Sequence, residues 1–136
     1  GLPTTTIAAP AADCNHDLIV SGGMDETWST PGYPGEYPEG ISCTLTVMIP
    51  ASPSMVLATM TLEQPSSIFV TKGCSTDNLA YTDSAGVTSR YCGDISPQTW
   101  SETTFYDGPK TFSFTFTSTA SDGNNDKGFS LRIKGM

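Results

Sequence analysis

Apolar residues recur at every second position over several short segments of this chain, and this spacing limits the fold more than any other feature. The clearest case is 111–117, where Phe112, Phe114 and Phe116 alternate with threonine and serine. Side chains of a β-strand point alternately to its two faces, so this spacing predicts a strand with one buried face. Similar segments occur at 44–49, 55–62 and 129–134, with shorter candidates at 68–71 and 79–82. We therefore expect an all-β protein.

Between these segments lie stretches rich in glycine, proline, serine and aspartate, the residues that turns favour. They occupy 31–40, 51–54, 83–86, 107–109 and 122–128. No long stretch has the apolar spacing of a helix. Short alternating strands separated by such turns are typical of two packed antiparallel sheets, and we therefore expect an antiparallel jelly-roll β-sandwich.

Four cysteines are spread along the chain, at Cys14, Cys43, Cys74 and Cys92. None belongs to a C-x-x-C pair, the spacing that zinc sites prefer. In a chain rich in threonine, serine, glycine and proline, such cysteines are more typical of two disulfides, which indicates a secreted or extracellular protein. Four cysteines allow three pairings, and their spacing does not choose among them.

Charge and length exclude several classes of partner. The 136 residues include 14 Asp and Glu against six Lys and Arg, a formal net charge of −8. This charge is a poor match for nucleic acid or anionic membranes, and no apolar run is long enough to cross a bilayer.

We expect one folded domain at 14–136, preceded at 1–13 by a flexible leader rich in proline, threonine and alanine. A chain of this kind fits either a free secreted protein or one module of a larger protein.

The sequence carries no recognisable catalytic motif. It has a single histidine, His16, so a mechanism that needs two imidazoles is excluded. No G-x-S-x-G, H-E-x-x-H or phosphate-binding glycine motif is present. We interpret His16 as a solvated residue near the start of the domain and predict a non-catalytic binding protein.

The segment 28–38 contains a Ser-x-Pro-x-Tyr-Pro turn and a second Tyr-Pro, and Cys43 follows it. Further marks come in a fixed order: Leu62-Glu63, Cys74 with Asp77 three residues later, Tyr91-Cys92-Gly93, Ser121-Asp122 and Gly128-Phe129. Together they resemble the signature of CUB domains over about 14–134. The resemblance implies a jelly-roll sandwich with disulfides Cys14–Cys43 and Cys74–Cys92. It also shows a departure, because 64–73 is longer than the usual family spacing.

The resemblance further implies a calcium site at one end of the sandwich. Many CUB domains bind Ca²⁺ with a glutamate at a strand end and two loop aspartates, and these match Glu63, Asp77 and Asp122. Gly123 and Asn125 add a flexible backbone and an amide oxygen. The alternative is that Asp77 and Asp122 only stabilise turns, as aspartate commonly does. Calcium takes about six to eight oxygen ligands, which such loops supply. In these CUB domains the ion orders loops that accept a basic group, which implies calcium-dependent binding of a protein with a basic surface.

Other functions fit the same fold. Trp100 and Tyr106 are candidates for stacking on a carbohydrate, and the methionines are candidates for lining a site for a small lipophilic ligand. A structural extracellular protein that self-associates into a homo-oligomer is a third class. Ligand-dependent tryptophan fluorescence would indicate the second class, and concentration-dependent oligomers without ligand would indicate the third.

Overall fold

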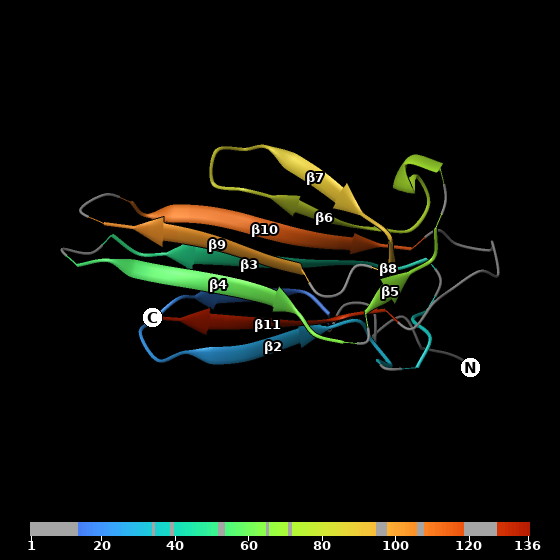
Figure 1. The fold of residues 1–136 in the computed structure, drawn as a ribbon, viewed down its shortest axis with the longest axis horizontal. Helices are drawn as coiled ribbons and strands as arrows, with labels where there is room; N and C mark the ends of the chain where they lie inside the picture. The colour runs from blue at the N-terminus through green and yellow to red at the C-terminus, as the bar shows by residue number, and fades with distance from the viewer. Residues whose placement is uncertain are drawn as a thin grey trace, which may run out of the picture.

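The structure, a computed structural model, describes residues 14–33, 35–38, 40–51, 54–64, 66–70, 72–94, 98–105, 108–118 and 128–136. The predicted leader at 1–13 and most of the predicted turn at 122–128 lie outside the described residues. Within the described ranges, the chain forms a β-sandwich with one short 3-10 turn at Lys72–Cys74 (Figure 1). No helix in this part of the chain is long and apolar enough to cross a membrane.

Two main sheets form the sandwich. The larger sheet has five strands in the order β1 (His16–Ile19), β3 (Ser42–Ile49), β10 (Lys110–Thr117), β6 (Asn78–Thr82) and β7 (Thr88–Tyr91). The other has four strands in the order β2 (Asp25–Ser29), β11 (Ser130–Gly135), β4 (Val56–Leu62) and β9 (Gln98–Thr104). A small separate sheet pairs β5 (Ser67–Ile68) with β8 (Gly93–Asp94).

The inward faces of the two main sheets share one hydrophobic core. In β3, Leu45, Val47 and Ile49 are fully buried, while the residues between them are partly exposed. The three phenylalanines of β10 are buried in the same way. From the other sheet, Met60 of β4 and Ile133 of β11 lie opposite each other and are also buried. The predicted alternation and the β-sandwich are therefore confirmed.

Some strands are not apparent from apolar alternation. In β9 only Trp100 and Thr104 are buried, because β9 is an edge strand whose other residues face solvent or the rim of the sandwich. Of the described residues in the candidate strand at 68–71, only Ile68 lies in a strand, the short β5. Beyond β5, the N–H of Phe69 donates to the hydroxyl of Tyr37 rather than to a neighbouring strand. A side-chain contact of this kind leaves no trace in the local sequence pattern.

Both disulfides join the cysteines that the resemblance implies, Cys14 to Cys43 and Cys74 to Cys92. The first joins the chain just before β1 to the start of β3. These two strands run parallel, whereas the other described strand pairs are antiparallel. Parallel pairing needs a crossover between the strands, and here the chain makes it by passing through β2 in the other sheet.

Several segments meet at one end of the sandwich, on the right in Figure 1. Here β4 ends, and β6 and β11 begin. Ser67 of β5 exchanges two backbone hydrogen bonds with Gly128, at 2.8 and 2.9 Å. Gly128 has a φ of +81°, and a Cβ there would lie 2.0 Å from Oγ1 of Thr30, so only glycine fits. This end therefore holds together parts of the chain that are far apart in sequence.

Candidate functional sites

Asp77 is the only acidic residue that is buried among those described, and it has no exposed surface. It lies between Cys74 and the start of β6, at the end of the sandwich where the segments meet. The hydroxyl of Tyr37 donates a hydrogen bond to its Oδ2 at 2.6 Å. Burial of a carboxylate is unfavourable unless hydrogen bonds or a cation compensate for the lost water. Asp77 is therefore a candidate for a functional carboxylate.

Tyr37 connects Asp77 to the long segment 64–73. Its hydroxyl accepts a hydrogen bond from the N–H of Phe69 at 3.0 Å and donates to Asp77. Its ring is buried and packs edge-on against Phe116, with ring centroids 4.8 Å apart. In the sequence, Tyr37 stands out only as part of the turn signature at 28–38. Its link to Asp77, 40 residues away, carries no sequence signal.

Glu63 immediately follows β4 at the same end of the sandwich. Its Oε1 accepts a hydrogen bond from the hydroxyl of Ser130 at 3.1 Å. Its Oε2 lies 4.0 Å from a guanidinium nitrogen of Arg132, and the side chain is 41% exposed. Arg132 pairs more closely with Asp25, at 2.6 Å. Glu63 is therefore held in place but open to solvent.

The structure brings Glu63 and Asp77 to one end of the sandwich, and residues on either side of β5 link them. Ser66 donates its hydroxyl to the carbonyl of Glu63, and Phe69 further along contacts Tyr37. The other three predicted ligands, Asp122, Gly123 and Asn125, lie outside the described residues. Among the described residues, no group of three or more His, Cys, Asp or Glu side chains is placed to hold a metal. The two described carboxylates nevertheless have the oxygen chemistry that calcium requires.

Trp100 lies in the core at the edge of the sandwich, and Tyr106 lies outside the described residues. The indole ring packs against Tyr81, Tyr91 and Phe114 at centroid distances of 5.6, 5.3 and 5.1 Å. Its N–H donates to the hydroxyl of Tyr91 at 3.3 Å. Only 9% of the residue is exposed, so little of the ring is open for a carbohydrate to stack on.

An all-β module with two disulfides and a cluster of loops at one end belongs to a class of domain common in extracellular proteins. The sequence profile of the CUB domain family matches residues 14–133. The chain therefore belongs to the CUB domain family, as its sequence signature suggested.

Solved structures share the fold. The full extracellular region of zebrafish Gpr126/Adgrg6 matches with a TM-score of 0.71 and 22% identity, over 90% of this chain and 15% of that one. The CUB1-EGF-CUB2 domains of rat MASP-1 match with a TM-score of 0.66 and 17% identity, over 90% and 42%. The MASP-1 CUB2 domain bound to Ca²⁺ matches with a TM-score of 0.63 and 20% identity, over 87% and 96%.

The chain thus spans a small part of the first of these proteins and less than half of the second. At these identities the likeness shows a shared fold. No curated protein sequence matches the chain. CUB domains are typically non-catalytic modules for protein interaction in extracellular proteins, and two disulfides fit that setting.

Proposed function

We propose that this CUB domain is a secreted, calcium-dependent module that binds a partner with a basic surface. The observation that carries the proposal is the buried carboxylate of Asp77 at the end of the sandwich where Glu63 also lies. A divalent cation would compensate for the burial of such a carboxylate. Glu63, Asp77 and Asp122 would hold the ion, and the ion would supply positive charge that orders the surrounding loops.

Charge favours a basic partner. The chain carries a net charge of −8, and one bound calcium ion leaves it acidic. Complementary charge speeds the encounter of two proteins and makes it sensitive to salt. The MASP-1 CUB2 domain, which shares the fold, was solved with Ca²⁺ bound, which supports calcium binding in this fold.

The calcium proposal is tested by two variants of one loop. The family signature matches Asp122 to a calcium ligand, and Asp126 lies four residues further along the same segment. We therefore expect Asp122→Asn to weaken calcium binding at least about tenfold in calorimetry, because it removes a charged ligand. Asp126→Asn makes the same charge change a few residues away and serves as the control. Thermal unfolding of the unmodified protein should shift upward in calcium and downward in a chelator.

Two results would contradict the proposal. One is a melting temperature that changes with neither calcium nor chelator, and the other is equal calcium affinity for Asp122→Asn and Asp126→Asn. Partner chemistry is tested separately, by retention of the protein on an immobilised lysine-rich peptide. We expect retention in calcium and elution by chelator or by raised salt. Retention that is unchanged by chelator would show that the protein binds a basic partner without calcium.

A further inference from the structure

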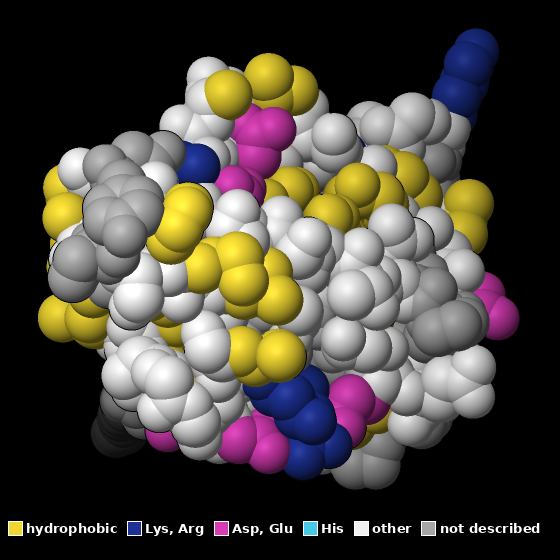
Figure 2. Space-filling model, turned by 60° about the vertical axis from the view of Figure 1, so that its left-hand side comes forward, with side chains coloured by type: hydrophobic (Ala, Val, Ile, Leu, Met, Phe, Trp, Pro, Cys, Tyr) yellow, Lys and Arg dark blue, Asp and Glu magenta, His cyan; other side chains and the backbone are white. Residues whose placement is uncertain are grey.

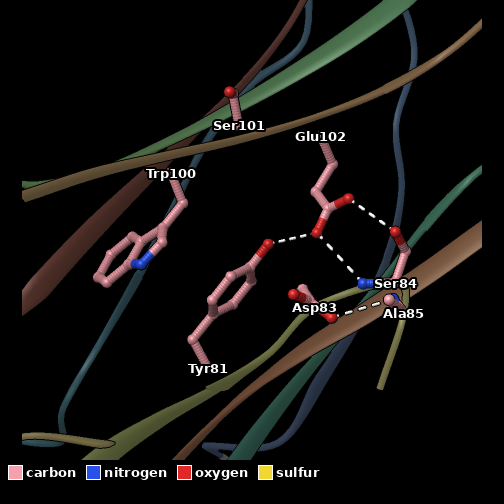
Figure 3. Close-up of a pocket in the computed structure, with 7 residues that line it drawn as sticks. All are labelled: Tyr81, Asp83, Ser84, Ala85, Trp100, Ser101 and Glu102. Carbon is pink, nitrogen blue, oxygen red and sulfur yellow. Dashed lines mark hydrogen bonds between the residues drawn. The ribbon is translucent and has the colours of Figure 1, made fainter. Parts of the chain in front are cut away.

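A pocket of about 330 Å³ opens at the side of the sandwich where β7 and β9 form the edges of the two sheets. Tyr81, Asp83, Ser84 and Ala85 line it from the end of β6 and the turn that follows. Trp100, Ser101 and Glu102 line it from β9 (Figure 3). Its volume is at the lower end of the range for ligand sites, so it suits a single side chain or a small molecule.

Glu102 is fixed at the pocket wall by three hydrogen bonds. The hydroxyl of Tyr81 and the N–H of Ser84 both donate to Oε2, the latter at 3.2 Å. The hydroxyl of Ser84 donates to Oε1 at 2.8 Å. These contacts join the turn after β6 to the opposite sheet, so the carboxylate is held in one position before any ligand binds.

Asp83 provides the second carboxylate. Its Oδ1 accepts hydrogen bonds from the N–H groups of Ala85 and Val87, at 3.0 and 2.9 Å, and so fixes the turn. The other oxygen points away from Ala85, on the side of the Tyr81 ring (Figure 3). Neither Asp83 nor Glu102 forms an ion pair with another residue in the described part of the chain. Figure 2 shows acidic side chains near the top of the face that it draws, with hydrophobic side chains around them.

The pocket offers more hydrogen-bond acceptors than donors. The hydroxyl hydrogens of Tyr81 and Ser84 are both used on Glu102, and the indole N–H of Trp100 is used on Tyr91. A carboxylate oxygen can accept two hydrogen bonds, so Oε1 of Glu102 and the free oxygen of Asp83 have acceptor capacity left. Lys110 donates its ammonium to the carbonyl of Thr103 at 2.7 Å and does not line the pocket. A complementary ligand must therefore bring donors and positive charge.

The aromatic walls narrow the ligand class further. The rings of Tyr81 and Trp100 lie side by side, with centroids 5.6 Å apart. Both residues are less than a tenth exposed, so they form a buried aromatic wall that attracts a cation rather than an open surface for stacking. The planar guanidinium of arginine can approach this wall while it donates to the carboxylates. A neutral sugar would need both donors and acceptors. The side-chain donors of Tyr81, Ser84 and Trp100 are already used, and the hydroxyl of Ser101 points away from Glu102 (Figure 3).

We propose that this pocket binds a basic side chain of a partner protein, arginine in particular, between the two carboxylates and against the two rings. The site is separate from the candidate calcium end. Asp77 precedes β6 and Asp83 follows it, so the rise of an extended strand places them about 20 Å apart. The proposal needs no calcium and stands independently of the proposed function.

The test is a titration of the protein with N-acetyl-arginine amide at constant ionic strength, followed by NMR. We expect saturable shifts of the backbone amides of Ser84, Ala85 and Ser101 and of the Trp100 indole, unchanged by chelator. N-acetyl-citrulline amide, which has the same shape without the charge, should cause none. Asp83→Asn keeps Oδ1 and therefore the turn, and we expect it to weaken arginine binding about tenfold. Glu26→Gln makes the same change of charge on the exposed surface of β2 and should leave the affinity within about twofold.

Equal shifts with N-acetyl-citrulline amide would overturn the proposal. So would shifts at acidic residues all over the protein surface, or an Asp83→Asn variant with unchanged affinity for N-acetyl-arginine amide. Glu102→Gln gives a second check, since it removes the other charge without removing the side chain. Loss of arginine binding in chelator would assign the effect to the calcium end instead. Calcium affinity measured on Asp83→Asn should equal that of the unmodified protein.

Discussion

The hydroxyl of Tyr81 lies against the carboxylate of Glu102, with Asp83 close by. Burial of the Tyr81 ring, followed by the hydrogen bond and charge of Glu102, raises the pKa of Tyr81 well above its ordinary value. The folded protein therefore holds this proton more tightly than the unfolded chain does. The Tyr81 hydroxyl therefore holds Glu102 in position, and its raised pKa reflects both the burial of the ring and the negative charge nearby.

This difference in pKa predicts how stability changes in alkali. The stabilisation linked to Tyr81 is complete below the pKa of an unfolded tyrosine, about 10, and is lost as the pH rises toward the higher folded pKa. Unfolding measurements above that pH should therefore show a steeper loss of stability for the unmodified protein than for Tyr81→Phe. Absorbance at the tyrosinate band of the folded protein should show one more late-titrating tyrosine in the unmodified protein than in Tyr81→Phe. An equal number of late-titrating tyrosines in the two proteins would contradict this prediction.

Among the elements, the junction between β5 and the start of β11 depends on one glycine. Gly128 has a positive φ, and a Cβ on it would overlap the side chain of Thr30. Backbone strain and overpacking each cost about 1–3 kcal/mol. We therefore expect Gly128→Ala to destabilise the protein by at least about 2 kcal/mol in chemical denaturation, because Thr30 is buried and has little room to move.

Gly86 offers a matched control for this junction. It has a similar φ of +88°, but a Cβ there meets no atom within 4 Å. Gly86→Ala should therefore show the backbone strain alone, about 1 kcal/mol. Equal losses for the two variants would show that Thr30 yields to the added methyl group and that contact at this junction is loose.

For the whole molecule, the two disulfides close loops over sequence separations of 29 and 18 residues. In the chain-entropy model, each bridge stabilises the fold by about 3 kcal/mol. Replacement of Cys74 and Cys92 by alanine should lower the free energy of unfolding by about that amount, as measured by urea denaturation. Replacement of Cys14 and Cys43 should have an effect of similar size. Small domains have about 5–15 kcal/mol in total, so loss of both bridges in a strong reductant should remove a large part of the stability and lower the melting temperature markedly.

Retention of the native melting temperature by either alanine pair would show that packing alone supports the sandwich. Loss of only one bridge should leave a cooperative transition, because the core is shared by both main sheets.

Local pattern predicted the strands that form the centre of each sheet. Phe112, Phe114 and Phe116 alternate because both neighbours of β10 are strands and one face is buried, so the pattern is strict. Edge strands such as β9 need only one or two buried residues. Their sequences are mostly polar and lack the apolar alternation that predicts a strand. The disulfide pairing came from the order of the family signature, since spacing alone left three choices.

The sequence by itself determined the all-β fold, the family and the net acidity, because these follow from periodicity, motif order and composition. Only the tertiary structure decided which acids are buried and which residues meet. Asp77 contacts Tyr37 across 40 residues, and Glu102 is held by a turn 18 residues away. Such contacts depend on how the two sheets pack. Packing brings together distant segments, and the local sequence of one segment does not predict which other segment it will contact.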